Sequence, residues 1–454
     1  MAKSKYLTAP LPSKKIPKGI PYILVNEATE RFAFYGMTSI LIIFMTEHLM
    51  ARDGTLAVMG EERAKMWFHL FKAAVYFLPF LGAFLSDIWL AKYRTIIYFS
   101  IVYCVGFAAL MLDHTRLGLG AALVLIATGS GLIKPCVSAN VGDQFGQANK
   151  HLINRVYHWF YFSINLGATI SMFVCPILLD RYNAYVGFGL PAVFMIAATV
   201  TYRLGRNKLV HIPAGGVGFV TETLSGEGLR AVGRLSIIFF LFIPMFWSLF
   251  DQSQSAWVLQ ATSMNLRWLG YTWRPAQLQA INPFLIMVMI PLFSYVIYPA
   301  INKVFHLTTL RKIGIGLFVA AFSFVVSACI ETRIAVGQAP SVGWQALAYV
   351  ILTAAEIMIS ITALEFAYTQ APKKMKSFIQ AVFLLSISLG NAFTAAVNAV
   401  IQNEDGTSKL PGASYFWFFV GVMLVTAVLF IPVAARYKVK DYIQNEAATE
   451  SSSG

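Results

Sequence analysis

Long apolar segments recur along this chain, and they limit its possible folds more than any other feature of the sequence. Each has about the length that an α-helix needs to cross the hydrocarbon core of a bilayer, roughly 20 residues. A backbone inside lipid must satisfy its own hydrogen bonds, so only helices and closed barrels span membranes, and a barrel would alternate apolar with polar residues. Hydrophobic residues make up 57% of the chain and charged residues 12%. The sequence therefore predicts an all-α integral membrane protein.

We place twelve such segments on the chain, in two groups of six. They cover residues 21–49, 67–89, 95–112, 117–141, 156–178 and 186–204, and then 233–257, 280–302, 309–331, 342–369, 377–401 and 413–435. The predicted organisation is an amino-terminal stretch 1–20, a six-helix bundle 21–204, a polar linker 205–232, a second six-helix bundle 233–435 and a tail 436–454. Two six-helix halves joined by a linker are typical of the major-facilitator fold, which holds substrate between its halves near the membrane midplane.

Basic residues fall on every second connection between these segments. They gather at 3–18, 92–94, 150–155, 203–208, 303–312, 373–376 and 436–440. Cytoplasmic connections are enriched in lysine and arginine, so we expect a multi-pass protein of the cell membrane, the inner membrane in a bacterium, with both termini in the cytoplasm. The same distribution accounts for the formal net charge of +14 without a nucleic-acid partner, because no single patch or arm collects it.

The first apolar segment contains three charged residues. Glu27, Glu30 and Arg31 stand at i, i+3 and i+4, which places them on one helical face, with Tyr35 one turn further along. One charge near the bilayer centre costs roughly 2.5–3.5 kcal/mol, so all three must face protein or water. Mutual neutralisation is one explanation. It leaves one carboxylate without a basic partner on this helix, and a carboxylate that exchanges protons is the other explanation.

Single charges interrupt three more apolar segments. Lys134 lies in the fourth, Asp251 in the seventh and Glu356 in the tenth. The first and seventh segments correspond between the two halves, as do the fourth and tenth. This placement favours charge pairs that form and break as the halves move against each other, over buried ions with a purely structural role.

The second segment adds two ionisable side chains. His69 is followed by Tyr76 on roughly the same helical face. A lone histidine is commonly a hydrogen-bonded core residue, but imidazole exchanges protons near neutral pH, so we include His69 among the proton-coupling candidates. Lys72 lies one turn after His69. It either extends toward a lipid headgroup or repels a proton from His69.

Several motifs can be compared with known families. Residues 26–36 have the sequence NEATERFAFYG, residues 131–145 GLIKPCVSANVGDQF, residues 246–257 FWSLFDQSQSAW, residues 282–283 NP and residues 364–372 LEFAYTQAP. The first resembles the ExxERFxYYG signature of the proton-dependent oligopeptide transporter family, and the others resemble that family's fourth-helix and second-half motifs. Gly82 to Asp87, followed by Lys92 and Arg94, is similar to a major-facilitator motif after the second helix. The resemblance covers nearly the whole chain.

This resemblance implies proton-driven uptake of di- and tripeptides by alternating access, with peptide-like drugs as further cargo. The proton is the coupling ion, and no other cofactor or metal is implied. The proton-coupling residues by resemblance are Glu27, Glu30, Arg31, His69 and Asp251, and the peptide-lining residues are Tyr35, Tyr76, Lys134, Asn165, Trp247, Asn282, Glu356, Ser360 and Phe383. The implied gating pairs are Lys134 with Glu356 on the cytoplasmic side and Arg31 with Asp251. A monomer is the expected functional unit in the lipid bilayer.

The chemistry agrees with a zwitterionic cargo. A peptide needs a cation for its carboxylate and an anion for its amine, and Lys134 or Arg31 together with Glu356 supplies both. Asn165 and Asn282 either bind the peptide amide or form hydrogen bonds between helices.

Three positions depart from the family pattern. Phe34 replaces the first signature tyrosine, Thr38 stands where an arginine is usual, and Phe383 replaces a frequent tryptophan. These changes bear on the range of substrates. The alternative cargo is nitrate or another small organic anion, for which Glu356 has less use. A receptor or scaffold without transport is a third hypothesis, and an enzyme is the least favoured, because the sequence has no nucleophile–base grouping or metal-ligand spacing.

Overall fold

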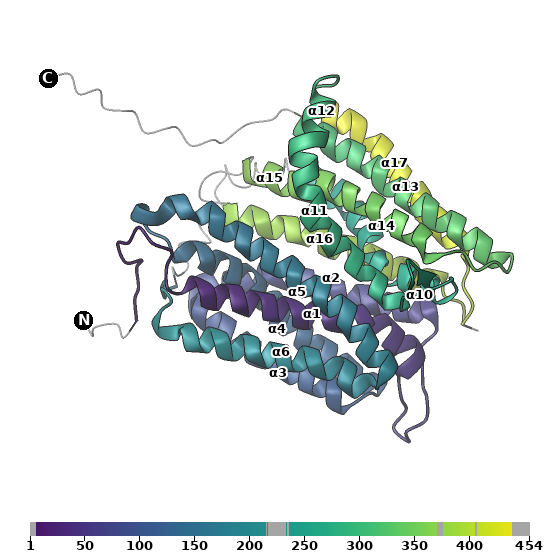
Figure 1. The fold of residues 1–454 in the computed structure, drawn as a ribbon, viewed down its shortest axis with the longest axis horizontal. Coiled ribbons are helices and arrows are strands. Elements are labelled where there is room, and N and C mark those ends of the chain that lie inside the picture. The colour runs from purple at the N-terminus through teal and green to yellow at the C-terminus, as the bar shows by residue number, and fades with distance from the viewer. Residues whose placement is uncertain are drawn as a thin grey trace.

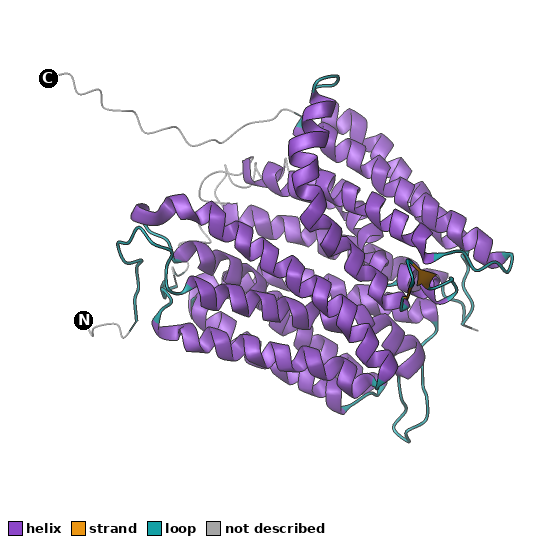
Figure 2. Ribbon diagram, in the orientation of Figure 1, coloured by secondary structure: helices purple, strands orange, loops and turns teal. Residues whose placement is uncertain are grey.

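The computed structural model describes residues 6–214, 216, 233, 236–369, 376–404 and 406–437, and it describes residues 154, 367–369 and 376–381 by their backbone alone. The regular secondary structure of this part is helical apart from one small antiparallel hairpin, and loops connect the helices (Figure 2). Most of the predicted linker and tail, residues 217–232 and 438–454, and the basic connection 370–375 lie outside the described residues. The prediction of an all-α architecture is confirmed.

Six long helices form the first half of the molecule. They are α1 (Ile20–Ile43), α2 (Glu61–Leu85), α3 (Lys92–Leu112), α4 (Arg116–Asp143), α5 (Ile153–Arg181) and α6 (Ala184–Leu204). π-Helical turns continue α1 through Phe44–His48 and α2 through Ser86–Leu90, and 3₁₀ turns at Gln147–Leu152 and Gly205–Asn207 precede α5 and follow α6.

The second half is helical but more interrupted. Its α-helices are α9 (Ile243–Phe250), α10 (Ala256–Thr262), α11 (Ile281–Leu292), α12 (Tyr298–Asn302), α13 (Thr309–Ala335), α14 (Val342–Glu356), α15 (Thr362–Thr369), α16 (Lys376–Ile401) and α17 (Ala413–Arg436). π-Helical turns lie at Ile238–Phe242, Phe293–Ile297 and Ile357–Ile361, 3₁₀ turns lie at Asp251–Gln254 and Pro275–Ala280, and β1 (Arg267–Trp268) pairs with β2 (Tyr271–Thr272).

Ten helical stretches in the described part are long and apolar enough to cross a membrane. Two predicted segments are not among the ten. The charged residues of α1 lower its hydropathy, and the segment 238–262 is divided into short helices around Asp251. All twelve predicted segments nevertheless have a helical counterpart.

The start of α2 differs from the prediction. The apolar pattern placed it at residue 67, whereas the helix begins at Glu61. Two polar residues of its first turns, Glu62 and Lys65, are nevertheless buried, and Lys65 Nζ lies 2.8 Å from Glu62 Oε2 on the same face. A hydrophobicity pattern misses such a turn, since ion pairing has replaced apolar packing.

Side-chain caps begin several helices. Thr115, Asn183, Thr308 and Ser341 each accept a hydrogen bond from a backbone N–H in the first turn of the following helix, at the starts of α4, α6, α13 and α14. These N–H groups have no partner within the helix, so each cap removes an unsatisfied donor.

The helices pack as two bundles. In Figure 1 the purple, blue and teal helices α1 to α6 lie below the green and yellow helices of the second half. Each bundle has its own cluster of buried apolar residues, and the first cluster also takes in Val258, Leu259 and Ala276 from the second half. The two bundles therefore share apolar contact where α10 and the turn before α11 meet α1 and α5.

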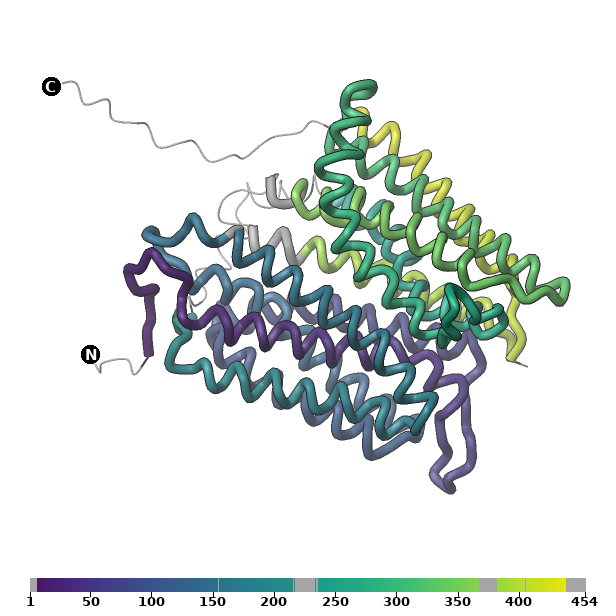
Figure 3. The backbone as a smooth tube through the Cα atoms, in the orientation of Figure 1, coloured from purple at the N-terminus to yellow at the C-terminus, as the bar shows by residue number. Residues whose placement is uncertain are grey.

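The bundles meet along two helix pairs. α2 packs along α16, and α5 packs against α11 and the Pro275–Ala280 turn. Figure 3 shows the tubes of the two halves close together on the side where α10 lies. We call this side the α10 face.

Gly167 allows α1 and α5 to pack closely. A Cβ atom at this position would lie 2.5 Å from the carbonyl oxygen of Ala28. Small residues let membrane helices approach in this way. Gly120 in α4 differs, because no atom lies within 4 Å of its hypothetical Cβ.

We expect Gly167→Val to destabilise the protein by about 1–3 kcal/mol, since the added atoms force α1 and α5 apart. Gly120→Val is the matched control, because it carries the same intrinsic cost of valine in a helix without the clash. Thermal unfolding of both purified variants in detergent measures the difference. Equal melting temperatures for the two variants would contradict the packing argument.

Candidate functional site

Two carboxylates of α1, Glu27 and Glu30, lie beside the same cation, Arg31. Arg31 Nε lies 2.8 Å from Glu27 Oε1 and 2.8 Å from Glu30 Oε2, and all three residues are buried. The single Nε hydrogen is donated to Glu27. Neither Glu30 oxygen accepts a hydrogen bond from the described residues. Two carboxylates thus compete for one guanidinium, as the spacing along the helix predicted.

Lys134 of α4 is a buried cation without a hydrogen-bond partner among the described residues. Its Nζ lies 4.6 Å from the centre of the Phe34 ring and 4.1 Å from the centre of the Tyr76 ring. Aromatic faces attract a cation but leave its N–H donors available.

Glu356 is the last residue of α14 and precedes the π-helical turn that contains Ser360. Its Oε2 accepts a hydrogen bond of 2.8 Å from Asn282 Nδ2, which also donates to Thr353 Oγ1. The contacts that the structure shows for Glu356 are therefore with a neutral amide. The implied pair of Lys134 with Glu356 is absent from this conformation, because Lys134 lies on the rings of its own half.

The aromatic candidates come from both halves. Trp247 of α9 is buried edge-on to Phe383 of α16, with ring centres 6.4 Å apart, and its Nε1 has no hydrogen-bond acceptor among the described residues. Tyr35 and Tyr76 are partly buried. Asn165 Nδ2 donates a hydrogen bond to the Tyr161 carbonyl oxygen of its own helix, so in this conformation the amide bonds within α5.

Asp251 has a different partner from the one implied by resemblance. Its Oδ1 lies 3.0 Å from Lys72 Nζ, and Arg31 is engaged with Glu27 and Glu30 instead. Lys72 does not extend toward a headgroup, because its side chain is only 1% exposed.

His69 belongs to the same polar network. Its Nδ1 lies 2.8 Å from Asn391 Oδ1, and its Nε2 lies 2.8 Å from Ser255 Oγ. Asn391 Nδ2 donates to Asp251 Oδ2 at 2.6 Å. The sequence singled out His69 and Asp251 but not Asn391 and Ser255, because a neutral polar side chain carries no distinctive signal.

Further polar contacts join the halves at the α10 face. Gln279 Nε2 donates to the Ser39 carbonyl oxygen at 2.9 Å, and Gln277 Nε2 donates to that of Phe173 at 3.1 Å. Arg274 Nε pairs with Asp180 Oδ2 at 2.7 Å. These bonds connect α1 and α5 of the first half with residues 274–279 of the second half.

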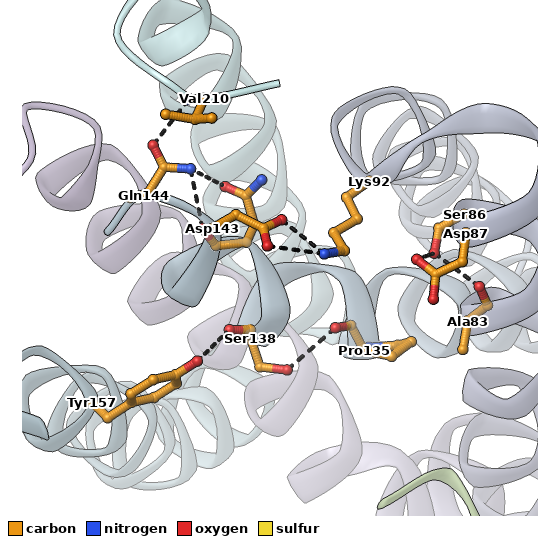
Figure 4. Close-up of polar contacts among 11 residues, drawn as sticks. Ala83, Ser86, Asp87, Lys92, Pro135, Ser138, Asp143, Gln144, Tyr157 and Val210 are labelled. Carbon is orange, nitrogen blue, oxygen red and sulfur yellow. Dashed lines mark hydrogen bonds and ion pairs between the residues drawn. The ribbon is translucent and has the colours of Figure 1, made fainter. Parts of the chain in front are cut away.

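The major-facilitator-like motif lies at other helix ends (Figure 4). Lys92 Nζ lies 2.8 Å from Asp143 Oδ2 at the end of α4, so this motif lysine pairs with Asp143 and not with Asp87. Gln144 Oε1 accepts a hydrogen bond from the Val210 backbone N–H at 3.0 Å, which ties the chain after α6 to α4.

Known proteins share both the sequence and the fold. The model of the POT family matches residues 93–225 and 216–418. Peptide transporter family 1 of Drosophila melanogaster is 35% identical over 70% of this chain and 48% of its own length, and human solute carrier family 15 member 2 is 33% identical over 70% and 49%. The chain thus spans about half the length of these curated relatives.

Solved structures cover more of the chain. The crystal structure of an auto-inhibited POT family peptide transporter superposes with a TM-score of 0.85, at 30% identity, over 95% of this chain and 99% of its own. A proton-dependent oligopeptide (POT) family transporter gives 0.76 at 35% identity, over 90% and 100%. These relatives are transporters and not enzymes, and the predicted major-facilitator fold is confirmed. The chain belongs to the POT family of transporters.

Proposed function

We propose that this protein moves di- and tripeptides into the cell together with protons, by alternating access between its two bundles. The observation that carries the proposal is the state of two charged side chains in opposite halves, both largely shielded by neighbouring helices. Lys134 has no hydrogen-bond partner among the described residues, and Glu356 accepts a hydrogen bond from a neutral amide.

The two charges suit the two ends of a peptide. The Lys134 ammonium offers its donors to a carboxylate, and Glu356 offers an acceptor to an amine, each as a charge-assisted hydrogen bond. Trp247 and Phe383 add apolar surface that tolerates different side chains. Nitrate or another small anion would use Lys134 but leave Glu356 without a role.

The α1 cluster supports proton coupling. Glu27 and Glu30 share Arg31, so one proton on either carboxylate turns an unbalanced set of charges into a neutral one. An entering proton supplies about 2.3 kcal/mol per 100 mV of membrane potential and about 1.4 kcal/mol per pH unit. Coupling requires that the proton and the peptide bias the same conformational equilibrium.

The arrangement of basic connections supports cytoplasmic termini in a cell membrane. The polar contacts at the α10 face, which lies opposite the termini in this topology, support a conformation closed to the outside. We propose a functional monomer in the bilayer that also accepts peptide-like drugs and that needs the proton as its only coupling ion.

We expect Lys134→Gln and Glu356→Gln each to lower dialanine uptake into liposomes by at least about tenfold, because a charged hydrogen bond to one peptide end is lost. Uptake is measured under an imposed proton gradient. Exposed Lys150→Gln and Glu404→Gln are the matched controls. Competition by di- and tripeptides but not by nitrate or free amino acids is expected, and competition by nitrate alone would establish the anion alternative.

For the proton we expect Glu27→Gln and Glu30→Gln to abolish accumulation of dialanine against its gradient while counterflow exchange continues. Exchange needs no net proton movement, so it reports that binding and conformational change survive. The measurement compares gradient-driven uptake with counterflow in the same proteoliposomes. Strong acid-driven accumulation in both variants would rule out the assignment of these carboxylates.

A further inference from the structure

Lys72 and Asp251 form a buried ion pair between the two halves. Lys72 lies in α2, and Asp251 begins the 3₁₀ turn after α9. The two side chains are 1% and 4% exposed, and Nζ lies 3.0 Å from Oδ1. A second hydrogen bond of 3.4 Å runs from Lys72 Nζ to Gln254 Oε1. Both of these polar contacts reach across from one bundle to the other.

The second oxygen of Asp251 is also engaged. Asn391 Nδ2 donates to Oδ2, which leaves Asn391 Oδ1 to accept from His69 Nδ1. With Nδ1 as donor, neutral His69 accepts at Nε2 from the Ser255 hydroxyl. His69, like Lys72, lies in α2, so the network connects the halves at two points of the same helix.

Arg31 pairs with other carboxylates than Asp251 in this arrangement. Its Nε lies 2.8 Å from each of two carboxylates on its own helix. The cation that neutralises Asp251 is thus Lys72, a residue outside the family signature.

We propose that Lys72 is a positioning residue for alternating access, whose ion pair with Asp251 latches the α10 face closed. The inference rests on the proposed transport cycle, in which the halves separate at this face. Separation must break the pair and expose both charges to water. The latch thereby sets how often the substrate-free protein opens on this side.

Removal of one charge acts unequally on the two conformations. In the closed state the remaining charge stays buried without its partner, which is strongly unfavourable, whereas in the open state water solvates it. Lys72→Met and Asp251→Asn should therefore both favour opening. Removal of both charges takes away the unpaired ion and should restore much of the closed population.

The test is a double-mutant cycle on conformation. Spin labels are attached to cysteines introduced at Tyr182 and Gln338, exposed positions beyond α5 and α13, after replacement of the four native cysteines by alanine. Double electron–electron resonance on the full-length protein in nanodiscs, without peptide or gradient, gives the ratio of long to short distances.

We expect this ratio to rise at least about tenfold in Lys72→Met and in Asp251→Asn, and to return to within about threefold of the parent in the double variant. Lys72→Arg should stay close to the parent. Lys208→Met is the matched control, because Lys208 bonds to Tyr22 within one half. If one single variant does not fold, the other carries the same expectation.

Parent-like distances in both single variants, or no recovery in the double variant, would overturn the latch. Unchanged distances together with weaker dialanine binding in Lys72→Met would make Lys72 a substrate-binding residue instead. The distances are recorded without cargo, so they remain informative if dialanine uptake fails and the proposed function is wrong.

Discussion

The cost of charge in an apolar environment is the constraint on which the rest of this structure depends. Each ion buried among the helices must find an opposite charge, an amide or an aromatic face. The protein uses all three solutions. Arg31 pairs with carboxylates on its own helix, Glu356 accepts from Asn282, and Lys134 lies over Phe34 and Tyr76. These solutions hold the bundle interior together and leave the charge on Lys134 open to a ligand.

Local periodicity accounts for what the sequence alone could predict. An apolar segment of about 20 residues predicts a membrane helix whatever lies beside it, and ten helical stretches of the described chain meet that criterion. The Glu27, Glu30 and Arg31 cluster was equally accessible, because residues at i, i+3 and i+4 meet on one helix without help from the rest of the fold. The sequence did not predict that Lys72 is the cation close to Asp251.

Tertiary packing determines the contacts that the sequence did not predict. Lys72 meets Asp251 only because α2 packs along α16 and beside the broken segment around residue 251. The amide of Asn391 forms hydrogen bonds with both Asp251 and His69. The sequence does not predict these bonds, because an asparagine in a helix has many possible partners. The structure forms neither of the implied pairs, Arg31 with Asp251 or Lys134 with Glu356, because tertiary packing gives Arg31, Asp251 and Glu356 other partners.

The latch and the proposed peptide site share two aromatic rings. Lys72 Nζ lies 5.8 Å from the Phe34 ring centre and 5.5 Å from that of Tyr76, and Lys134 lies over the same rings. Phe34 stands where the family signature has a tyrosine, so no hydroxyl there competes for either ammonium. On the proposed mechanism, a peptide carboxylate at Lys134 would also attract Lys72 and compete with Asp251 for it. Lys72 and Lys134 lie near the same two rings, so one peptide carboxylate would attract both cations. Binding of the peptide would then weaken the ion pair of Lys72 with Asp251.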